Sequence, residues 1–120
     1  MNKKKVFILN DDRQTVALMK TSLEAAGFES IPAYNWSEAV TKLIETEPDL
    51  IIIDLALQGV SGIRFYHTFK TYFFGSIPFV IYGEGDPPAA LELAAGDKFL
   101  NKKDNIGNIV KVAQDILNQP

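Results

Sequence analysis

The sequence predicts an α/β domain in which five strands form a parallel sheet and helices cover both of its faces. Short apolar runs alternate five times with segments whose apolar residues recur at helical spacing, which is the pattern (βα)5 of a doubly wound sandwich. Such an alternation requires right-handed crossovers between neighbouring parallel strands. The 120 residues suffice for one core, and we expect a single domain over residues 1–120.

The expected strands are short runs of apolar and branched residues. Leu50–Ile53 is the clearest, because its apolar run is uninterrupted, as in strands that helices cover on both faces. The second strand is weaker, and the fourth begins with a proline, which the first residue of a strand tolerates. In order, the expected strands are Val6–Leu9, Phe28–Ala33, Leu50–Ile53, Pro78–Tyr82 and Lys98–Asn101.

The expected helices carry recognisable start and stop residues. Gly27 is a natural left-handed cap for the end of the first helix, and Asn35 with a glutamate three residues later resembles a capping box. Ser61 can cap the third helix, and Asp86 followed by Pro87 can open a short fourth one. The helices are expected at Gln14–Ala26, from Asn35 to before Pro48, at Gly62–Phe74, from Asp86 to near Ala95, and at Ile106–Leu117.

Composition argues against several classes of function. The 12 basic and 15 acidic residues give a net charge of −3, whereas a protein that binds nucleic acid directly and non-specifically is usually basic. There is no cysteine, which excludes disulfides and thiolate metal sites. No segment approaches the ~20 apolar residues that span a bilayer. We therefore expect a soluble, cytoplasmic protein without direct nucleic-acid or membrane partners.

Charged and small residues follow the ends of the predicted strands. In an open parallel sheet these ends border one crevice, where ligands bind. Three carboxylates in such a crevice form a site for a hard cation, and they can also take part in chemistry. The residues are Asp11 and Asp12 after the first strand, Asp54 after the third, Gly83 and Glu84 after the fourth, and Lys102 after the fifth.

This constellation resembles the receiver domain of two-component response regulators, over essentially the whole chain. Pro48–Asp54 looks like the family's strand into its phosphoacceptor, and Asp54–Gly62 keeps the spacing to the glycine that opens the third helix. Ile77-Pro78 opens the fourth strand as in the family, and Phe99–Lys102 matches the aromatic residue and lysine of the fifth. The resemblance implies a flavodoxin-like sheet with strand order 2-1-3-4-5.

The resemblance also implies a reaction. Asp54 would become an acyl phosphate, and Mg²⁺ would bind Asp11, Asp12, Asp54 and the backbone carbonyl of Ala56. Lys102 would pair with Asp54 at rest and with a phosphoryl oxygen afterwards. The donor would be a phosphohistidine on a sensor histidine kinase or phosphotransfer protein, or a small acyl phosphate. The output would pass by protein contacts to a downstream protein or an attached output domain, so the chain is expected to be a signalling domain rather than an enzyme.

The chain departs from the family's pattern on one side of the crevice. Gly83 stands where a serine or threonine is usual, and Glu84 where a small residue is usual. Gln58 and Lys103 both replace a proline. The connection after the fourth strand is about three residues short, nearly one helical turn. Phe99 occupies the place of the family's rotating aromatic residue, a switch position together with Gly83 and Glu84.

Simpler interpretations stand beside the phosphoacceptor. The aspartate pair could cap the first helix, Asp54 a loop, and Lys102 could lie on the surface. Phe99 could be an ordinary half-buried strand residue. For the whole chain, the main alternative is a receiver-like interaction module that phosphate does not switch. A flavodoxin-type FMN site or a dehalogenase-type phosphatase fits poorly, because the first loop is acidic and lacks the Asp-x-Asp spacing.

The third predicted helix is rich in aromatic residues, more than a single stripe can bury. Extra core packing is the favoured interpretation, and an exposed surface for a partner or a homodimer is the alternative. His67, the only histidine, lies on this helix and is read as a surface or packing residue. The aromatic residues are Phe65, Tyr66, Phe69, Tyr72, Phe73 and Phe74.

Overall fold

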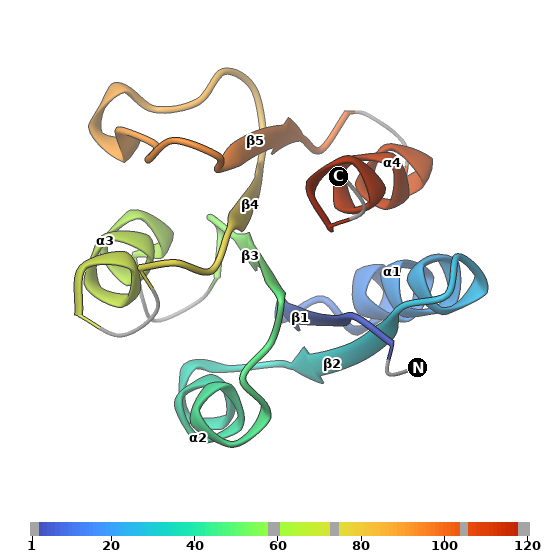
Figure 1. Ribbon diagram of the computed structural model, residues 1–120. Helices are drawn as coiled ribbons and strands as arrows, with labels where there is room; N and C mark the ends of the chain where they lie inside the picture. The colour runs from blue at the N-terminus through green and yellow to red at the C-terminus, as the bar shows by residue number, and fades with distance from the viewer. Residues whose placement is uncertain (1–2, 58–60, 73–74, 104–105, 118–120) are drawn as a thin grey trace.

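The computed structural model describes residues 3–57, 61–72, 75–103 and 106–117. Within these ranges the chain forms strands and helices in alternation (Figure 1). The strands are β1 (Lys5–Leu9), β2 (Glu29–Ala33), β3 (Leu50–Asp54), β4 (Phe79–Gly83) and β5 (Lys98–Asn101). The helices are α1 (Arg13–Ala25), α2 (Trp36–Thr46), α3 (Gly62–Tyr72), the 3₁₀ turn η1 (Ala89–Leu91) and α4 (Ile106–Leu117).

The strands form one parallel sheet of order β2-β1-β3-β4-β5, which confirms the expected flavodoxin-like order 2-1-3-4-5. The register keeps the carboxyl ends of the strands level, because Asp54 pairs with Tyr82 and Gly83 pairs with Asn101. On the other side of β3, Ile53 pairs with Leu9, the last residue of β1. This level edge is what brings the residues after each strand together.

Each face of the sheet has its own apolar core. Successive strand residues point to opposite faces, so Phe7 and Ile51 join one core and Val6 and Ile52 the other. Figure 1 shows α2 and α3 on one side of the sheet (left) and α1 and α4 on the other (right). Because both faces are covered, β3 is apolar from Leu50 to Ile53, as predicted from the sequence, and only its last residue, Asp54, is polar.

The expected helix ends are mostly confirmed. Asn35 accepts a hydrogen bond from the backbone of Glu38 (2.9 Å) and caps α2. Ser61 Oγ accepts from the backbone of Arg64 (3.3 Å) at the start of α3. Gly27 follows α1 with φ +97°, the left-handed conformation that its lack of a side chain favours. No helix in the described ranges is both long and apolar enough to cross a membrane.

The helix expected from Asp86 to near Ala95 is wrong, because only the single 3₁₀ turn η1 forms there. The residue before a proline is kept out of the helical region, and Pro87 and Pro88 follow one another here. Pro88, rather than Asp86, stands at the start of the turn, and Glu92 ends it in the left-handed conformation (φ +44°). The described chain therefore has four α-helices around five strands rather than a full (βα)5 set.

A buried polar network holds the connection between η1 and β5 against α3. The Tyr66 hydroxyl donates to Asp97 Oδ2 (2.5 Å) and accepts from the backbone of Ala94 (2.8 Å). Asp97 Oδ1 accepts from the backbone of Phe79 (2.9 Å) and from Lys70 Nζ (3.1 Å). Burial, with Asp97 beside the hydroxyl, raises the pKa of Tyr66 to about 12. These polar contacts join the segment where a helix was expected to α3 and β4.

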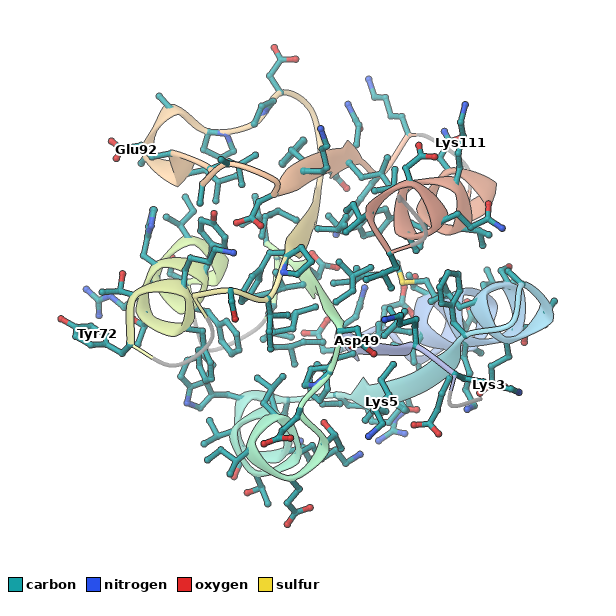
Figure 2. The ribbon with its side chains drawn as sticks, in the orientation of Figure 1. Lys3, Lys5, Asp49, Tyr72, Glu92 and Lys111 are labelled. Atoms are coloured by element: carbon teal, nitrogen blue, oxygen red, sulfur yellow. The ribbon has the colours of Figure 1, made fainter. Side chains whose placement is uncertain are left out.

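The aromatic residues of α3 divide between core and surface. Phe65, Tyr66 and Phe69 are buried, so extra core packing is confirmed for them. Tyr72 is 77% exposed and projects away from the helix (Figure 2), whereas Phe73 and Phe74 lie outside the described residues. His67 is half-buried, with Nε2 3.1 Å from the carbonyl oxygen of Ala90, as a packing residue would be.

Candidate functional site

The level carboxyl edge of the sheet gathers the predicted site residues. Asp11 and Asp12 follow β1, Asp54 ends β3, and Gly83 ends β4. Lys102 follows β5, and its backbone N–H donates to the carbonyl of Gly83 (2.8 Å), which continues the β4–β5 ladder by one residue. The parallel register therefore sets where the lysine stands relative to the acids.

Asp54 and Lys102 form an ion pair at this edge. Lys102 Nζ lies 2.9 Å from Asp54 Oδ1, and the backbone N–H of Ala56 donates to the same oxygen (2.8 Å). Asp54 is 5% exposed, so its carboxylate depends on these contacts in place of water. The two residues that sequence reasoning placed together are in direct contact, and the surface interpretation of Lys102 is wrong.

Asp12 caps α1, as the simpler interpretation of the aspartate pair expected. Its carboxylate accepts from the backbone of Gln14 (3.1 Å) and from Thr15 Oγ1 (2.9 Å). The hydrogen bond from Thr15 is the largest of several causes that lower the pKa of Asp12, and the positive charge of Lys102 adds to them. The same cation thus pairs with Asp54 and also acts on Asp12.

The carboxylates of Asp11, Asp12 and Asp54 do not form a closed metal site. In the residues that the structure describes, no group of three or more Asp, Glu or His side chains is close enough to hold a cation. Asp11 and Ala56 are exposed at the edge, and Asp12 is engaged in its cap. Mg²⁺ retains several waters and needs few protein ligands, so it does not require a closed cage of protein oxygens.

The residues at the predicted switch position pack against each other. A Cβ atom on Gly83 would lie 3.2 Å from Cε2 and Cζ of Phe99 and 3.1 Å from Cδ1 of Leu55. Phe99 is half-buried and joins the core beneath α2 and α3, as the simpler interpretation expects, and a switch role for it stays a prediction. Glu84, the next residue, is exposed. Gln58, another departure from the family's pattern, lies outside the described residues.

Sequence reasoning missed one supporting residue, Asn10, and did not find the reason for a second, Gly62. Asn10 is buried, and its Oδ1 accepts from the backbone of Asp12 (2.8 Å), which orients the aspartate segment. Gly62 is needed because a Cβ there would stand 2.7 Å from the Cα of Leu55, immediately after Asp54. The spacing from Asp54 to Gly62 was visible in the sequence, but the close approach behind it was not.

Comparisons with known proteins agree with this geometry. A family profile described as the response regulator receiver domain matches residues 6–114. The KDP operon transcriptional regulatory protein KdpE of Escherichia coli (strain K12) is 29% identical over 108 residues, which cover 87% of this chain and 47% of that protein. The alkaline phosphatase synthesis transcriptional regulatory protein PhoP of Bacillus subtilis (strain 168) is 35% identical over 61 residues, 51% of this chain and 25% of that protein. The chain thus spans about half or less of the length of the curated relatives it matches.

Solved structures show the same fold. The chemotaxis response regulator CheY4 of Vibrio cholerae superimposes with a TM-score of 0.85 at 22% identity, covering 97% of this chain and 100% of that chain. A putative response regulator from Chloroflexus aurantiacus gives a TM-score of 0.85 at 20% identity, covering 98% of this chain and 100% of that chain. At these identities the likeness establishes the fold, and the profile match establishes the family.

Proposed function

We propose that this chain, a member of the response regulator receiver domain family, accepts a phosphoryl group on the carboxylate of Asp54 with the help of Mg²⁺. The observation that carries the proposal is the contact of 2.9 Å between Lys102 Nζ and Asp54 Oδ1 at the acidic edge of the sheet. A nearly buried carboxylate that already holds a cation is suited to a reaction in which negative charge accumulates.

The proposed reaction is a transfer between two anions. An oxygen of Asp54 forms a bond to phosphorus while the bond from phosphorus to the donor atom breaks, and the bonding electron pair leaves with the donor. The product is an acyl phosphate on Asp54. Lys102 then exchanges its contact with Asp54 for one with a phosphoryl oxygen. Catalysis consists mainly of positioning and charge neutralisation.

Mg²⁺ would be held by Asp11, Asp12, Asp54 and the backbone carbonyl of Ala56. When bound, it would neutralise phosphoryl charge and orient the donor. The oxygen donors suit this hard cation, and the lowered pKa of Asp12 favours the charged form that a metal requires. The Thr15 hydroxyl, which now bonds Asp12 Oδ2, would have to share or release that oxygen.

The proposed partners follow from the family. The donor is a phosphohistidine of a sensor histidine kinase or phosphotransfer protein, or a small acyl phosphate. The signal passes by protein–protein contacts to a downstream protein or an attached output domain, in the cytoplasm and without direct contact to nucleic acid or membrane. Two of the similar curated proteins are named as transcriptional regulators and are longer than this chain, which supports an output outside the receiver. The output surface would also serve a homodimer.

A second candidate function is a receiver-like interaction module that phosphate does not switch. The packing of Phe99 over Gly83 favours it, because residue 83 offers no hydroxyl that could bind a phosphoryl oxygen. The exposed carboxylate of Glu84 also adds negative charge beside the site. In this candidate function the fold and the partner surface are the same, but Asp54 accepts no phosphoryl group.

Intact-mass measurement after incubation with Mg²⁺ and acetyl phosphate separates the two candidates. We expect one phosphoryl adduct, which Asp54→Asn abolishes. Asp49→Asn is the matched control, because Asp49 accepts from the backbone of Lys5 (2.7 Å), a residue that begins β1 at the opposite edge of the sheet. An adduct that survives Asp54→Asn would identify another nucleophile. If no adduct forms and beryllofluoride shows no Mg²⁺-dependent binding, the interaction module is the candidate that remains.

A further inference from the structure

Lys102 needs a restraint that its own side chain does not supply. Its ammonium stands on a flexible stem of four methylenes, and its side chain is 25% exposed. Ordering such a side chain costs entropy, so the backbone that carries it has to be held firmly. The next residue is Lys103, which lacks the ring by which a proline would fix the turn.

The side chain of Asn101 brackets Lys102 on both sides. Its Oδ1 accepts from the backbone N–H of Lys103 (3.0 Å), a turn in which an asparagine bonds the backbone two residues later. Its Nδ2 donates to the backbone carbonyl of Gly85 (3.1 Å), in the connection after β4. One amide group therefore spans the segments that follow both β4 and β5.

Gly85 presents its carbonyl through an unusual backbone conformation. Its φ is +71°, which residues with a side chain adopt only with strain. A Cβ at this position would meet nothing within 4 Å, so crowding does not explain the glycine. The backbone conformation itself, which directs the chain past Asn101, is what a substitution at position 85 would disturb.

We infer that Asn101 is a positioning residue that holds Lys102 toward Asp54. The backbone N–H of Lys102 donates to the carbonyl of Gly83, at the end of β4. The side-chain amide of Asn101 bonds Lys103, on the other side of Lys102, and also Gly85 in the segment after β4. The inference rests on the proposed function of Asp54 and Lys102, and it adds a residue that touches neither the phosphoryl group nor the metal. It also connects the shortened segment after β4 to the reacting pair.

Asn101→Ala and Gly85→Ala test the inference from its two ends, with Asn35→Ala as the matched control. Asn35 also makes two side-chain hydrogen bonds, both to Glu38 at the start of α2, and it follows β2, the strand at the far end of the sheet from β5. We expect the rate of Asp54 phosphorylation by acetyl phosphate and Mg²⁺ to fall about three- to tenfold in both test variants, the effect of one or two lost hydrogen bonds. Asn35→Ala is expected to keep the wild-type rate.

NMR relaxation of the Lys102 Cε methylene provides a second readout that needs no phosphorylation. We expect increased motion of this group in Asn101→Ala and Gly85→Ala but not in Asn35→Ala. If the wild type forms no adduct while the methylene still loosens in the two variants, the proposed function fails and the positioning role of Asn101 stands. If the methylene is unchanged in both, or Asn101→Ala reacts at the wild-type rate, the inference is overturned.

Discussion

The ring of Phe99 occupies the space that a side chain on Gly83 would need. Two of its carbons lie 3.2 Å from the position of a Cβ atom on residue 83, closer than an ordinary van der Waals contact. The last residue of β4 and the aromatic residue of β5 are therefore matched in size. Phe99 packs into the core over this glycine, and residue 83 offers no hydroxyl group that could contact the ring.

We predict that the effect of Gly83→Ala on stability depends on Phe99. In a strand, alanine is favoured over glycine by roughly 0.5–1 kcal/mol, but here the new methyl must displace the ring. In a Phe99→Leu background, which lacks the two ring carbons, the alanine should cost less stability, because of the three closest atoms the flexible Cδ1 of Leu55 at 3.1 Å would remain. Urea unfolding of the four proteins measures the coupling, expected at about 1 kcal/mol. Equal effects of Gly83→Ala in both backgrounds would contradict the packing argument.

The response to a phosphoryl mimic should be local. Because residue 83 has no hydroxyl to follow the phosphoryl group, beryllofluoride with Mg²⁺ is expected to shift the NMR signals of Asp54, Ala56 and Lys102 strongly and those of Phe99 weakly. The reason is that Phe99 is already packed over Gly83. Shift mapping with and without the mimic checks this. A shift at Phe99 as large as that at Lys102 would indicate that the switch operates by another route.

Sequence reasoning succeeded where the physics is local or repetitive. The uninterrupted apolar run of β3 indicated a strand covered on both faces, and the parallel pattern placed Asp54 and Lys102 at one edge of the sheet. Their pairing was expected from the resemblance to the receiver family. The caps at Asn35 and Ser61 were also correct, because a cap depends on two or three neighbouring positions.

The parts that could not be predicted depend on distant residues or on competing local preferences. Tyr66 and Asp97 are 31 positions apart, and nothing in their neighbourhoods announces their hydrogen bond. The helix expected at Asp86 failed because an N-cap signal competed with two successive prolines, and the prolines prevailed. Asn101 looked like an ordinary strand end until its partners after β4 and β5 were in place.

Tyr66→Phe should destabilise the protein by roughly 1–3 kcal/mol, because it leaves the backbone N–H of Ala94 and one oxygen of Asp97 without their partner. It should also change the response to alkali. The pKa of Tyr66 is about 12 in the folded protein and 10.0 as the ordinary value, so the folded state keeps a proton that the unfolded state loses. This contribution to stability is complete below pH 10.0 and is lost as the pH rises toward about 12.

Unfolding of the wild type and Tyr66→Phe at several pH values above 9 measures the difference in their unfolding free energies. The contributions of the other tyrosines and of the lysines are the same in both proteins and cancel in this difference. The gap in unfolding free energy is expected to narrow as the pH rises. A gap that stays constant would mean that the hydroxyl of Tyr66 titrates alike in the folded and unfolded states.

Gly62→Ala should disturb both the fold and the proposed reaction, because Gly62 lies against Leu55, the residue after the proposed phosphoacceptor Asp54. The new Cβ would stand 2.7 Å from Cα and 2.9 Å from the carbonyl oxygen of Leu55, and backbone atoms cannot yield as a flexible side chain can. We expect a loss of roughly 1–3 kcal/mol in unfolding free energy, together with slower phosphorylation, since Leu55 follows Asp54 directly.

Gly75→Ala is the control, because its Cβ would meet a single atom, the carbonyl oxygen of Lys70, at 3.2 Å, far from Asp54 in the fold. If Gly62→Ala were as stable and as reactive as Gly75→Ala, the segment after Asp54 would have to move freely. The position of the Asp54 carboxylate would then not depend on α3.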